Sequence, residues 1–171
     1  VSGFELDGHQ FIDQAIKNGA TAVVIEKELP KYQNRISYIK VDNSRKVMAL
    51  LAKNFFKDPL AEIKLIGITG TNGKTTTSYL LYNILKEHAG SAALFGTIKN
   101  VIGNYELDSS RTTPESIDLY RYFSQMQEKG VEYAVMEVSS HALDLYRVEG
   151  MEFTAAVFTN ISPEHLDYHK N

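Results

Sequence analysis

The sequence predicts an α/β fold, in which a mostly parallel sheet carries helices on both faces and follows part of a smaller α/β domain. Runs of β-branched residues alternate with segments of helical periodicity, as in parallel sheets joined by helices. Polar motifs follow four of the expected strands, and open α/β sheets bind ligands at the carboxyl ends of their strands. The stretch "KDPLAE" (57–62) interrupts the pattern at a proline, which predicts a domain boundary near residue 60.

The first part of the chain has the pattern of a small α/β unit. The expected elements are a helix over 8–19, a buried strand over 21–26, a second strand over 37–41 and a helix over 42–56. Ser44 is the expected N-cap of the last helix, whose apolar stripe consists of Val47, Leu50, Leu51 and Phe55.

The second part repeats strand and helix several times. We expect strands over 63–69, 91–97, 131–138 and 153–160, helices over 74–88 and 113–130, and a small hairpin over 100–107 around Gly103-Asn104. The strands at 131–138 and 153–160 are apolar enough to be buried. Thr113 is the expected N-cap of the helix over 113–130, and Pro114 its first residue.

The composition excludes several function classes. The chain has 171 residues, 18 basic and 21 acidic, a net charge of −3 and no cysteine. Cysteine-zinc sites, disulfides and thiolate nucleophiles are therefore excluded. No block of positive charge favours a nucleic-acid or membrane-surface partner, and no apolar segment reaches the length of a membrane span.

The stretch "GITGTNGKTTT" (67–77) is the strongest chemical signal. Gly70 and Gly73 lie between an expected strand and an expected helix, where backbone N–H groups and a helix N-terminus bind phosphate. Lys74 can reach terminal phosphates and the Thr75 hydroxyl can bind Mg²⁺. The standard spacing would require glycine where the chain has Ile68, so the motif is a variant of the phosphate-binding loop.

A buried acid is the second signal. Glu137 ends the apolar run "YAVME", and a buried carboxylate needs a cation or hydrogen-bond donors. In phosphate-loop proteins a nearby acid at a strand end commonly binds the metal. The alternative is an edge carboxylate or a helix-cap acceptor. A Ser140–His141 hydrolase is a weaker hypothesis, because adjacent side chains rarely face each other.

Two further polar segments are ambiguous on their residues alone. In 159–169, His165 and His169 are four residues apart and could share a helix face, but hydrogen-bonded loop histidines are the commoner arrangement. In 109–116, Arg111 precedes a helix start, which suits a phosphate, a carboxylate or an ordinary cap. Arg147 is either a surface arginine or an anion contact, and His9 is expected to serve a helix-cap region.

Four motifs in this order resemble the Mur ligases. They are "GITGTNGKTTT", "RTTPES", "MEVSSHALDLYRV" and "AVFTNISPEHLDYH", which span most of 60–169, while "DGHQFIDQAIKNGA" resembles the end of that family's first domain. The motifs look closest to the branch that adds the third amino acid, diaminopimelate or lysine, to UDP-MurNAc-L-Ala-D-Glu. In this family the loop is T-G-T-N-G-K-[ST], which accounts for Ile68.

The resemblance implies a role for each motif. It implies that the loop residues Gly70, Thr71, Asn72, Gly73, Lys74, Thr75 and Thr76 bind ATP. It implies that Thr75, Glu137 and His165 bind Mg²⁺, that Lys74, Glu137 and His165 are catalytic, and that Thr112, Thr113, Ser139 and Arg147 bind the UDP-MurNAc-dipeptide. Some members of the family carry Asn in place of Arg111 and Gln in place of Leu145, and Glu164 stands where Asp is commoner.

The resemblance also implies a reaction. The substrate carboxylate attacks the γ-phosphoryl group of ATP, and the incoming amine then attacks the acyl phosphate, so ATP and Mg²⁺ are required. It implies that residues 1–60 are the end of the UDP-substrate domain and 61–171 the start of the central ATP-binding domain, in a monomeric enzyme of the bacterial cytoplasm. The family's amino-acid-binding domain and modified lysine lie outside the 171 residues, so we expect the chain alone to be inactive.

Three other functions remain open from the residues. A folylpolyglutamate synthetase shares the ligase architecture, but "RTTPES" together with "MEVSSHAL" favours a muramyl substrate. A non-catalytic phosphate-loop module would bind nucleotide without a sugar-peptide ligand. A small-molecule kinase would transfer phosphate to a hydroxyl group and would not depend on an amine.

Overall fold

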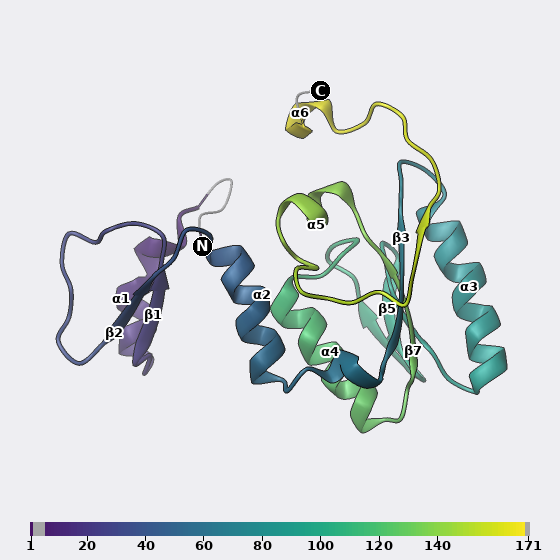
Figure 1. Ribbon diagram of the computed structural model, residues 1–171, viewed down its shortest axis with the longest axis horizontal. Coiled ribbons are helices and arrows are strands. Elements are labelled where there is room, and N and C mark those ends of the chain that lie inside the picture. Colours follow the sequence, from purple (N-terminus) through teal and green to yellow (C-terminus); the bar gives the residue numbers. More distant parts are fainter. Residues whose placement is uncertain (2–5, 170–171) are drawn as a thin grey trace. The chain divides into compact units, whose positions relative to one another are not determined.

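The computed structural model describes residues 1 and 6–169, which form two compact units, Val1–Met48 and Ala49–Asn171 (Figure 1). The division falls within helix α2 (Ser44–Phe55). The domain boundary near residue 60 stays a prediction. Within the described residues, no helix combines the length and the apolar character needed to cross a membrane.

The first unit contains two parallel strands and short helices. The 3-10 helix η1 (Gly8–Phe11) leads into α1 (Ile12–Lys17), so the expected helix over 8–19 is split and shorter. Strand β1 (Ala22–Ile25) pairs in parallel with β2 (Ser37–Lys40). Only Ile25 of β1 is buried, so the prediction of a buried strand was wrong for most of its length. A two-stranded sheet offers each strand one neighbour and leaves its side chains partly exposed.

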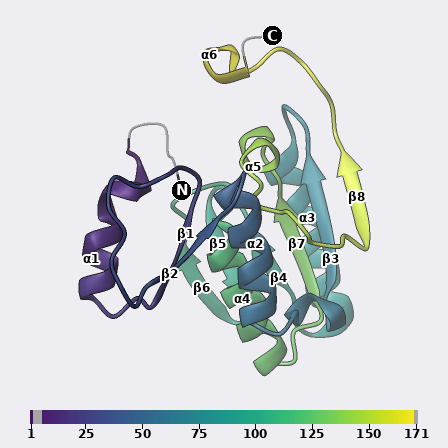
Figure 2. The same cartoon turned by 60° about the vertical axis from the view of Figure 1, so that its left-hand side comes forward.

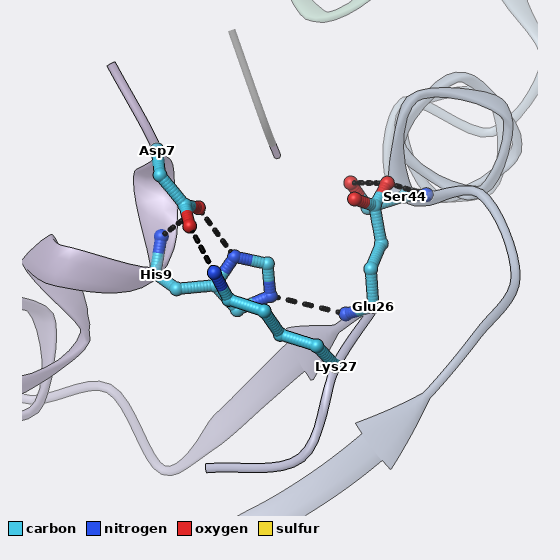
Figure 3. Close-up of polar contacts among 5 residues, drawn as sticks. All are labelled: Asp7, His9, Glu26, Lys27 and Ser44. Carbon is cyan, nitrogen blue, oxygen red and sulfur yellow. Dashed lines mark hydrogen bonds and ion pairs between the residues drawn. The ribbon is translucent and has the colours of Figure 1, made fainter.

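Polar side chains fix the start of the first unit (Figure 3). Asp7 caps η1 by accepting the His9 N–H, and its carboxylate also contacts His9 Nδ1 at 2.6 Å and the Lys27 ammonium. His9 Nε2 accepts the Glu26 N–H at 3.1 Å, which leaves the proton on Nδ1. These bonds give His9 the structural, cap-region role that the sequence predicts.

The second unit is built on a six-stranded sheet of order β6-β5-β4-β7-β3-β8. Its strands are β3 (Lys64–Thr69), β4 (Ala93–Phe95), β5 (Lys99–Ile102), β6 (Tyr105–Asp108), β7 (Tyr133–Glu137) and β8 (Ala155–Phe158). The four strands β4, β7, β3 and β8 are parallel, while β5 and β6 form the expected antiparallel hairpin, so the sheet is mostly parallel as predicted.

Helices cover both faces of this sheet, as the fold prediction required (Figures 1 and 2). Helix α3 (Lys74–Ala89) packs on one face, where Tyr82 meets Leu94 and Val135. Helix α4 (Ser116–Glu128) packs on the other face, where Phe123 meets Phe95 and other buried residues. Because side chains alternate along a strand, neighbours such as Val135 and Met136 enter opposite cores.

The remaining elements are short. The 3-10 helix η2 (Pro59–Glu62) precedes β3, α5 (Ser140–Asp144) follows β7, and α6 (Leu166–His169) ends the described chain. None of the three was expected from periodicity, since helices of one turn carry too few residues to show it.

Two expected caps were wrong. Helix α4 begins at Ser116 with Glu115 at its N-cap, so neither Thr113 nor Pro114 starts it. The Thr113 hydroxyl is instead buried and bonds to the end of β7. Ser44 is the first residue of α2 rather than its cap: Asn43 Oδ1 accepts the Lys46 N–H, while Ser44 bonds to Glu26.

Several side chains expected in the core are exposed. The sequence also predicts an apolar side on α3 made of Leu80, Leu81, Ile84 and Leu85, but Leu80 and Ile84 are exposed. On α2, Leu50, Leu51 and Phe55 of the expected stripe are exposed. Strand β8 was expected to be buried, yet three of its four residues are exposed. It is the last strand of the sheet and pairs only with β3, so its side chains have neighbours on one side only.

Candidate functional site: a phosphate-binding loop beside a buried glutamate

The phosphate-loop candidate connects β3 to α3, as the sequence predicts. Gly70 has φ +129° and Gly73 φ +86°, which are backbone conformations that favour glycine. Helix α3 starts at Lys74, and the first amide groups of a helix have no intrahelical acceptor. Those N–H groups and the positive end of the helix dipole provide an anion-binding end beside the loop.

The Lys74 ammonium lies over the loop. Its Nζ donates to the carbonyl oxygens of Gly70, at 2.5 Å, and Thr71, at 2.8 Å. The cation is therefore held next to the helix N-terminus by two neutral carbonyl acceptors. A phosphate oxygen would be a stronger acceptor for this ammonium than a carbonyl oxygen, because the phosphate carries negative charge.

Glu137 lies fully buried at the carboxyl end of β7, beside the loop. Its Oε2 accepts the hydroxyl groups of Thr75, at 2.9 Å, and Thr97, at 3.0 Å. Its Oε1 accepts the Thr97 N–H at 3.2 Å and the Ser78 hydroxyl at 3.3 Å. Four donors thus surround a carboxylate that would otherwise be costly to bury.

A cavity of about 300 Å³ joins the loop to this carboxylate. Its lining is polar and comes from the ends of several strands and from the loops after them: Thr71, Asn72, Gly73, Lys74, Thr75, Thr97, Thr112, Glu137, Ser139, Ser140, Glu164 and His165. The cavity therefore brings together side chains from all four sequence motifs. Gly70, Thr76, Thr113 and Arg147 do not line it.

Thr113 and Arg147 lie behind the cavity wall. The Thr113 hydroxyl donates to the Glu137 carbonyl oxygen at 2.8 Å and accepts the Ser139 N–H at 3.1 Å. Arg147 donates to the Thr113 carbonyl oxygen at 3.0 Å and pairs with Glu115 at 3.0 Å. These bonds join the 109–116 loop to the end of β7. Arg111 also pairs with Glu115.

Three histidines lie close together, and one of them, His165, lines the cavity. The His141 ring lies 4.7 Å from the His165 ring and 5.3 Å from the His169 ring, measured between centroids. Burial, and then the charges of these two neighbours, lower the pKa of His141. His169 Nε2 lies 2.9 Å from the Ser140 hydroxyl, so Ser140 pairs with a distant histidine rather than with its neighbour His141.

Thr97 and Ser78 are site residues that sequence reasoning did not single out. Thr97 donates its N–H and its hydroxyl to Glu137, and its hydroxyl oxygen also lies 3.1 Å from the Thr112 hydroxyl oxygen. Its position at the end of an expected strand was the only feature of the sequence that could have marked it as a site residue. Ser78 lies one turn into α3 and shows no distinguishing sequence pattern. Gly96 also belongs here, because a Cβ at that position would lie 2.3 Å from Glu137 Oε1.

The donor set near the loop fits a hard cation. The Glu137 carboxylate and the Thr75 hydroxyl offer adjacent oxygen atoms, which Mg²⁺ prefers to nitrogen or sulfur. His165 lines the same cavity. In the part of the chain that the structure describes, no group of three or more His, Cys, Asp or Glu side chains is arranged to hold a metal ion.

Comparison with family models decides the family. The Mur ligase middle domain matches residues 68–171, and the Mur ligase family catalytic domain matches residues 1–56. The chain belongs to the Mur ligase family. The resemblance stated from the four motifs is thereby confirmed.

Curated Mur ligases similar to this chain share a name. The UDP-N-acetylmuramoyl-L-alanyl-D-glutamate--2,6-diaminopimelate ligase of Alkaliphilus metalliredigens is 50% identical over all of this chain and over 34% of its own length. The enzyme of the same name from Clostridium perfringens is 48% identical over 99% of this chain and 35% of its own length. The chain thus spans about a third of the curated relatives that it matches.

Solved Mur ligase structures agree with the fold. A structure titled as a UDP-N-acetylmuramoyl-L-alanyl-D-glutamate--2,6-diaminopimelate ligase matches 94% of this chain and 32% of that one, with 30% identity and a TM-score of 0.79. A MurF ligase from Thermotoga maritima in complex with ADP matches 100% of this chain and 36% of that one, with 27% identity and a TM-score of 0.60. The prediction of an α/β Mur ligase fold is confirmed.

Proposed function

We propose that this chain supplies the ATP-phosphate site of a ligase that adds 2,6-diaminopimelate to UDP-MurNAc-L-Ala-D-Glu in peptidoglycan synthesis. The observation that carries the proposal is the juxtaposition of the glycine loop, Lys74 and the buried Glu137 around one polar cavity. A phosphate-loop switch could share the loop, but the other three motifs that reach this cavity are those of Mur ligases.

The choice of amino acid rests on the relatives. The sequence leaves diaminopimelate and lysine open, and similar curated ligases from several organisms are named for diaminopimelate. A substrate linked to UDP and a requirement for ATP favour the cytoplasm as the place of action.

We assign the domains and the site on the same grounds. Residues 1–60 would be the end of the UDP-substrate domain and 61–171 the start of the ATP-binding domain; the family models match these two parts separately. The loop Gly70–Thr76 would bind ATP, and Thr112 and Ser139, which line the cavity, would contact the dipeptide substrate. Thr113 and Arg147 would act on that substrate by shaping the wall behind it.

The chain's own groups account for much of the expected chemistry. Phosphoryl transfer needs positioning and charge neutralisation more than covalent help. Lys74 would exchange its loop carbonyl partners for phosphate oxygens and so hold the γ-phosphoryl group near the substrate carboxylate. Glu137 and Thr75, with His165, would hold Mg²⁺, which when bound neutralises charge on the phosphates.

Product analysis tests the proposal. The full-length gene product that contains this chain is incubated with ATP, Mg²⁺, UDP-MurNAc-L-Ala-D-Glu and either diaminopimelate or lysine, and the products are identified by mass spectrometry. We expect one ADP and one phosphate per amide bond formed with diaminopimelate. ATP consumption without any amide product, or with a stable phosphorylated alcohol, would contradict the proposal.

A further inference from the structure

The segment after β8 runs along the phosphate-binding loop. Thr159 donates its hydroxyl to the Asn72 carbonyl oxygen at 2.7 Å. Thr71 donates its N–H to the Asn160 carbonyl oxygen at 3.0 Å. The Thr71 hydroxyl also donates to the Ser162 carbonyl oxygen at 3.1 Å and accepts the Ser162 N–H at 2.9 Å. Donors in the loop and donors in the 159–162 segment therefore both contribute hydrogen bonds, which join two segments about 90 residues apart.

Gly70 shows how closely the two segments approach. A Cβ at this position would lie 2.2 Å from the Thr159 hydroxyl oxygen and 2.7 Å from the Asn160 carbonyl oxygen. Real Cβ atoms do not occur at such distances, and the Asn160 carbonyl belongs to the backbone. The loop is therefore shaped against the 159–162 segment as well as by its own glycines.

Asn160 makes the most specific of these contacts. Its Oδ1 accepts the Asn72 N–H at 2.9 Å, and its Nδ2 donates to the Asn72 carbonyl oxygen at 3.0 Å. One side-chain amide thus pairs with both peptide groups of a single loop residue. This pairing fixes the direction of the Asn72 N–H and of its carbonyl group, immediately before the Gly73 turn.

We propose that Asn160 is a positioning residue for the nucleotide phosphates, acting through the backbone of Asn72. With the Asn72 peptide held, the Asn72 carbonyl oxygen is kept away from the anion and the N–H groups at the start of α3 remain aimed at it. The proposal rests on the proposed function, because it assumes that the loop binds phosphate.

The test compares two asparagine variants of the full-length gene product. Asn160→Ala removes both amide bonds, whereas Asn83→Ala removes an exposed asparagine on α3 that donates to the Tyr79 carbonyl oxygen. Binding of ADP with Mg²⁺ is measured by calorimetry and the melting temperature by scanning. Without these two bonds the binding-competent shape of the loop becomes less populated in the free protein, and a drop to about a tenth of the molecules lowers the ADP affinity about tenfold.

We expect Asn160→Ala to weaken ADP binding by about tenfold, to raise the KM for ATP more than it lowers kcat, and to leave the KM for the amino acid unchanged. Asn83→Ala should bind ADP like the unmodified protein. Unchanged ADP affinity in Asn160→Ala would overturn the inference. So would a fall in melting temperature with no preferential rise in the KM for ATP. If the unmodified protein bound no ADP, the proposed function itself would fail.

Discussion

Glu137 is the residue on which the site depends, and it owes its position to a glycine. Gly96 lies beside the carboxylate, and a methyl group there would come within 2.3 Å of Oε1. The carboxylate would have to turn away from the hydroxyl groups of Thr75 and Thr97, which would lose this buried acceptor, whereas the Ser78 hydroxyl would keep the Thr75 carbonyl oxygen as its acceptor.

We therefore expect Gly96→Ala to weaken Mg²⁺-dependent ADP binding at least tenfold and to lower the free energy of unfolding by about 1–3 kcal/mol, the usual cost of overpacking. Calorimetry and urea denaturation measure these changes. Adding Glu137→Asp shortens the carboxylate and should recover part of the lost stability. If Glu137→Asp destabilised the Gly96→Ala variant as much as it destabilises the unmodified protein, the clash between residues 96 and 137 would not be the cause of the lost stability.

Tyr120 on α4 should make the stability of the protein depend on pH. Its ring is buried in the core, and its hydroxyl has no hydrogen-bond partner in the described structure. Burial raises the pKa of Tyr120 to about 12, from an ordinary value of 10.0. The folded state therefore keeps the proton in a range where the unfolded chain loses it. The associated stability is complete below pH 10 and is lost as the pH rises from 10 towards 12.

Tyr120→Phe removes both this titration and the unpaired hydroxyl. We expect the variant to be at least as stable as the unmodified protein at pH 8, because no hydrogen bond is lost. We also expect a smaller loss of stability between pH 10 and pH 11, measured by urea denaturation at each pH. The exposed Tyr105→Phe is the matched control. An equal pH dependence in Tyr120→Phe and the unmodified protein would refute the argument.

Site residues whose type is unusual for their local surroundings could be predicted from the sequence. Residues whose role depends on contacts with distant segments could not. Glu137 could be predicted because an acid in an apolar run must find donors. The donors themselves could not, since Thr97 lies 40 residues away and Ser78 lies 59 residues away. Thr113 was predicted to be a helix cap because it precedes Pro114, but its hydroxyl instead donates to the carbonyl oxygen of Glu137 at the end of β7.

The two ends of helix α3 have different roles. Its N-terminal end follows the phosphate-binding loop and carries Lys74, whereas its C-terminal end stops the helix at the C-cap residue Gly90, which has φ +75°. An added Cβ at Gly90 would meet nothing within 4 Å, so a substitution there costs only backbone strain.

We expect Gly90→Ala to lower the free energy of unfolding by about 1 kcal/mol and to leave ADP affinity unchanged. Denaturant titration and calorimetry provide the two measurements, with the exposed Glu87→Ala on the same helix as the control. A loss of ADP affinity in Gly90→Ala comparable to that in Gly96→Ala would show that the two ends of α3 are coupled.

Element types were easier to predict than their limits and exposure. The strands and long helices of the second unit were identified because their apolar runs are long, and each was found within a few residues of its expected place. Burial was predicted less well: Leu80 and Ile84 fit a helical stripe, yet α3 turns Tyr82 and Ser78 inward instead. Periodicity gives a helix two candidate faces, and packing against the sheet selects one.

At the scale of the whole molecule, the site is assembled by topology. Parallel strands β4, β7, β3 and β8 bring their carboxyl ends to one edge, so residues more than 90 positions apart, such as Thr71 and His165, line one cavity. The parallel arrangement, and with it the gathering of the motifs at one edge, could be predicted from the sequence. The order of the strands in the sheet could not, because strand pairing depends on contacts between distant segments.

In the proposed function, the cavity at this edge of the sheet binds ATP for amide-bond formation. The most direct test is ADP release by the full-length gene product in the presence of ATP, Mg²⁺, UDP-MurNAc-L-Ala-D-Glu and diaminopimelate, with Lys74→Ala alongside. We expect ADP release that stops when either the UDP-linked dipeptide or diaminopimelate is omitted and that falls at least a hundredfold in Lys74→Ala, on the order of one lost charge-stabilising contact, with an unchanged melting temperature. Unchanged ADP release in a folded Lys74→Ala protein would contradict the proposed role of the cavity.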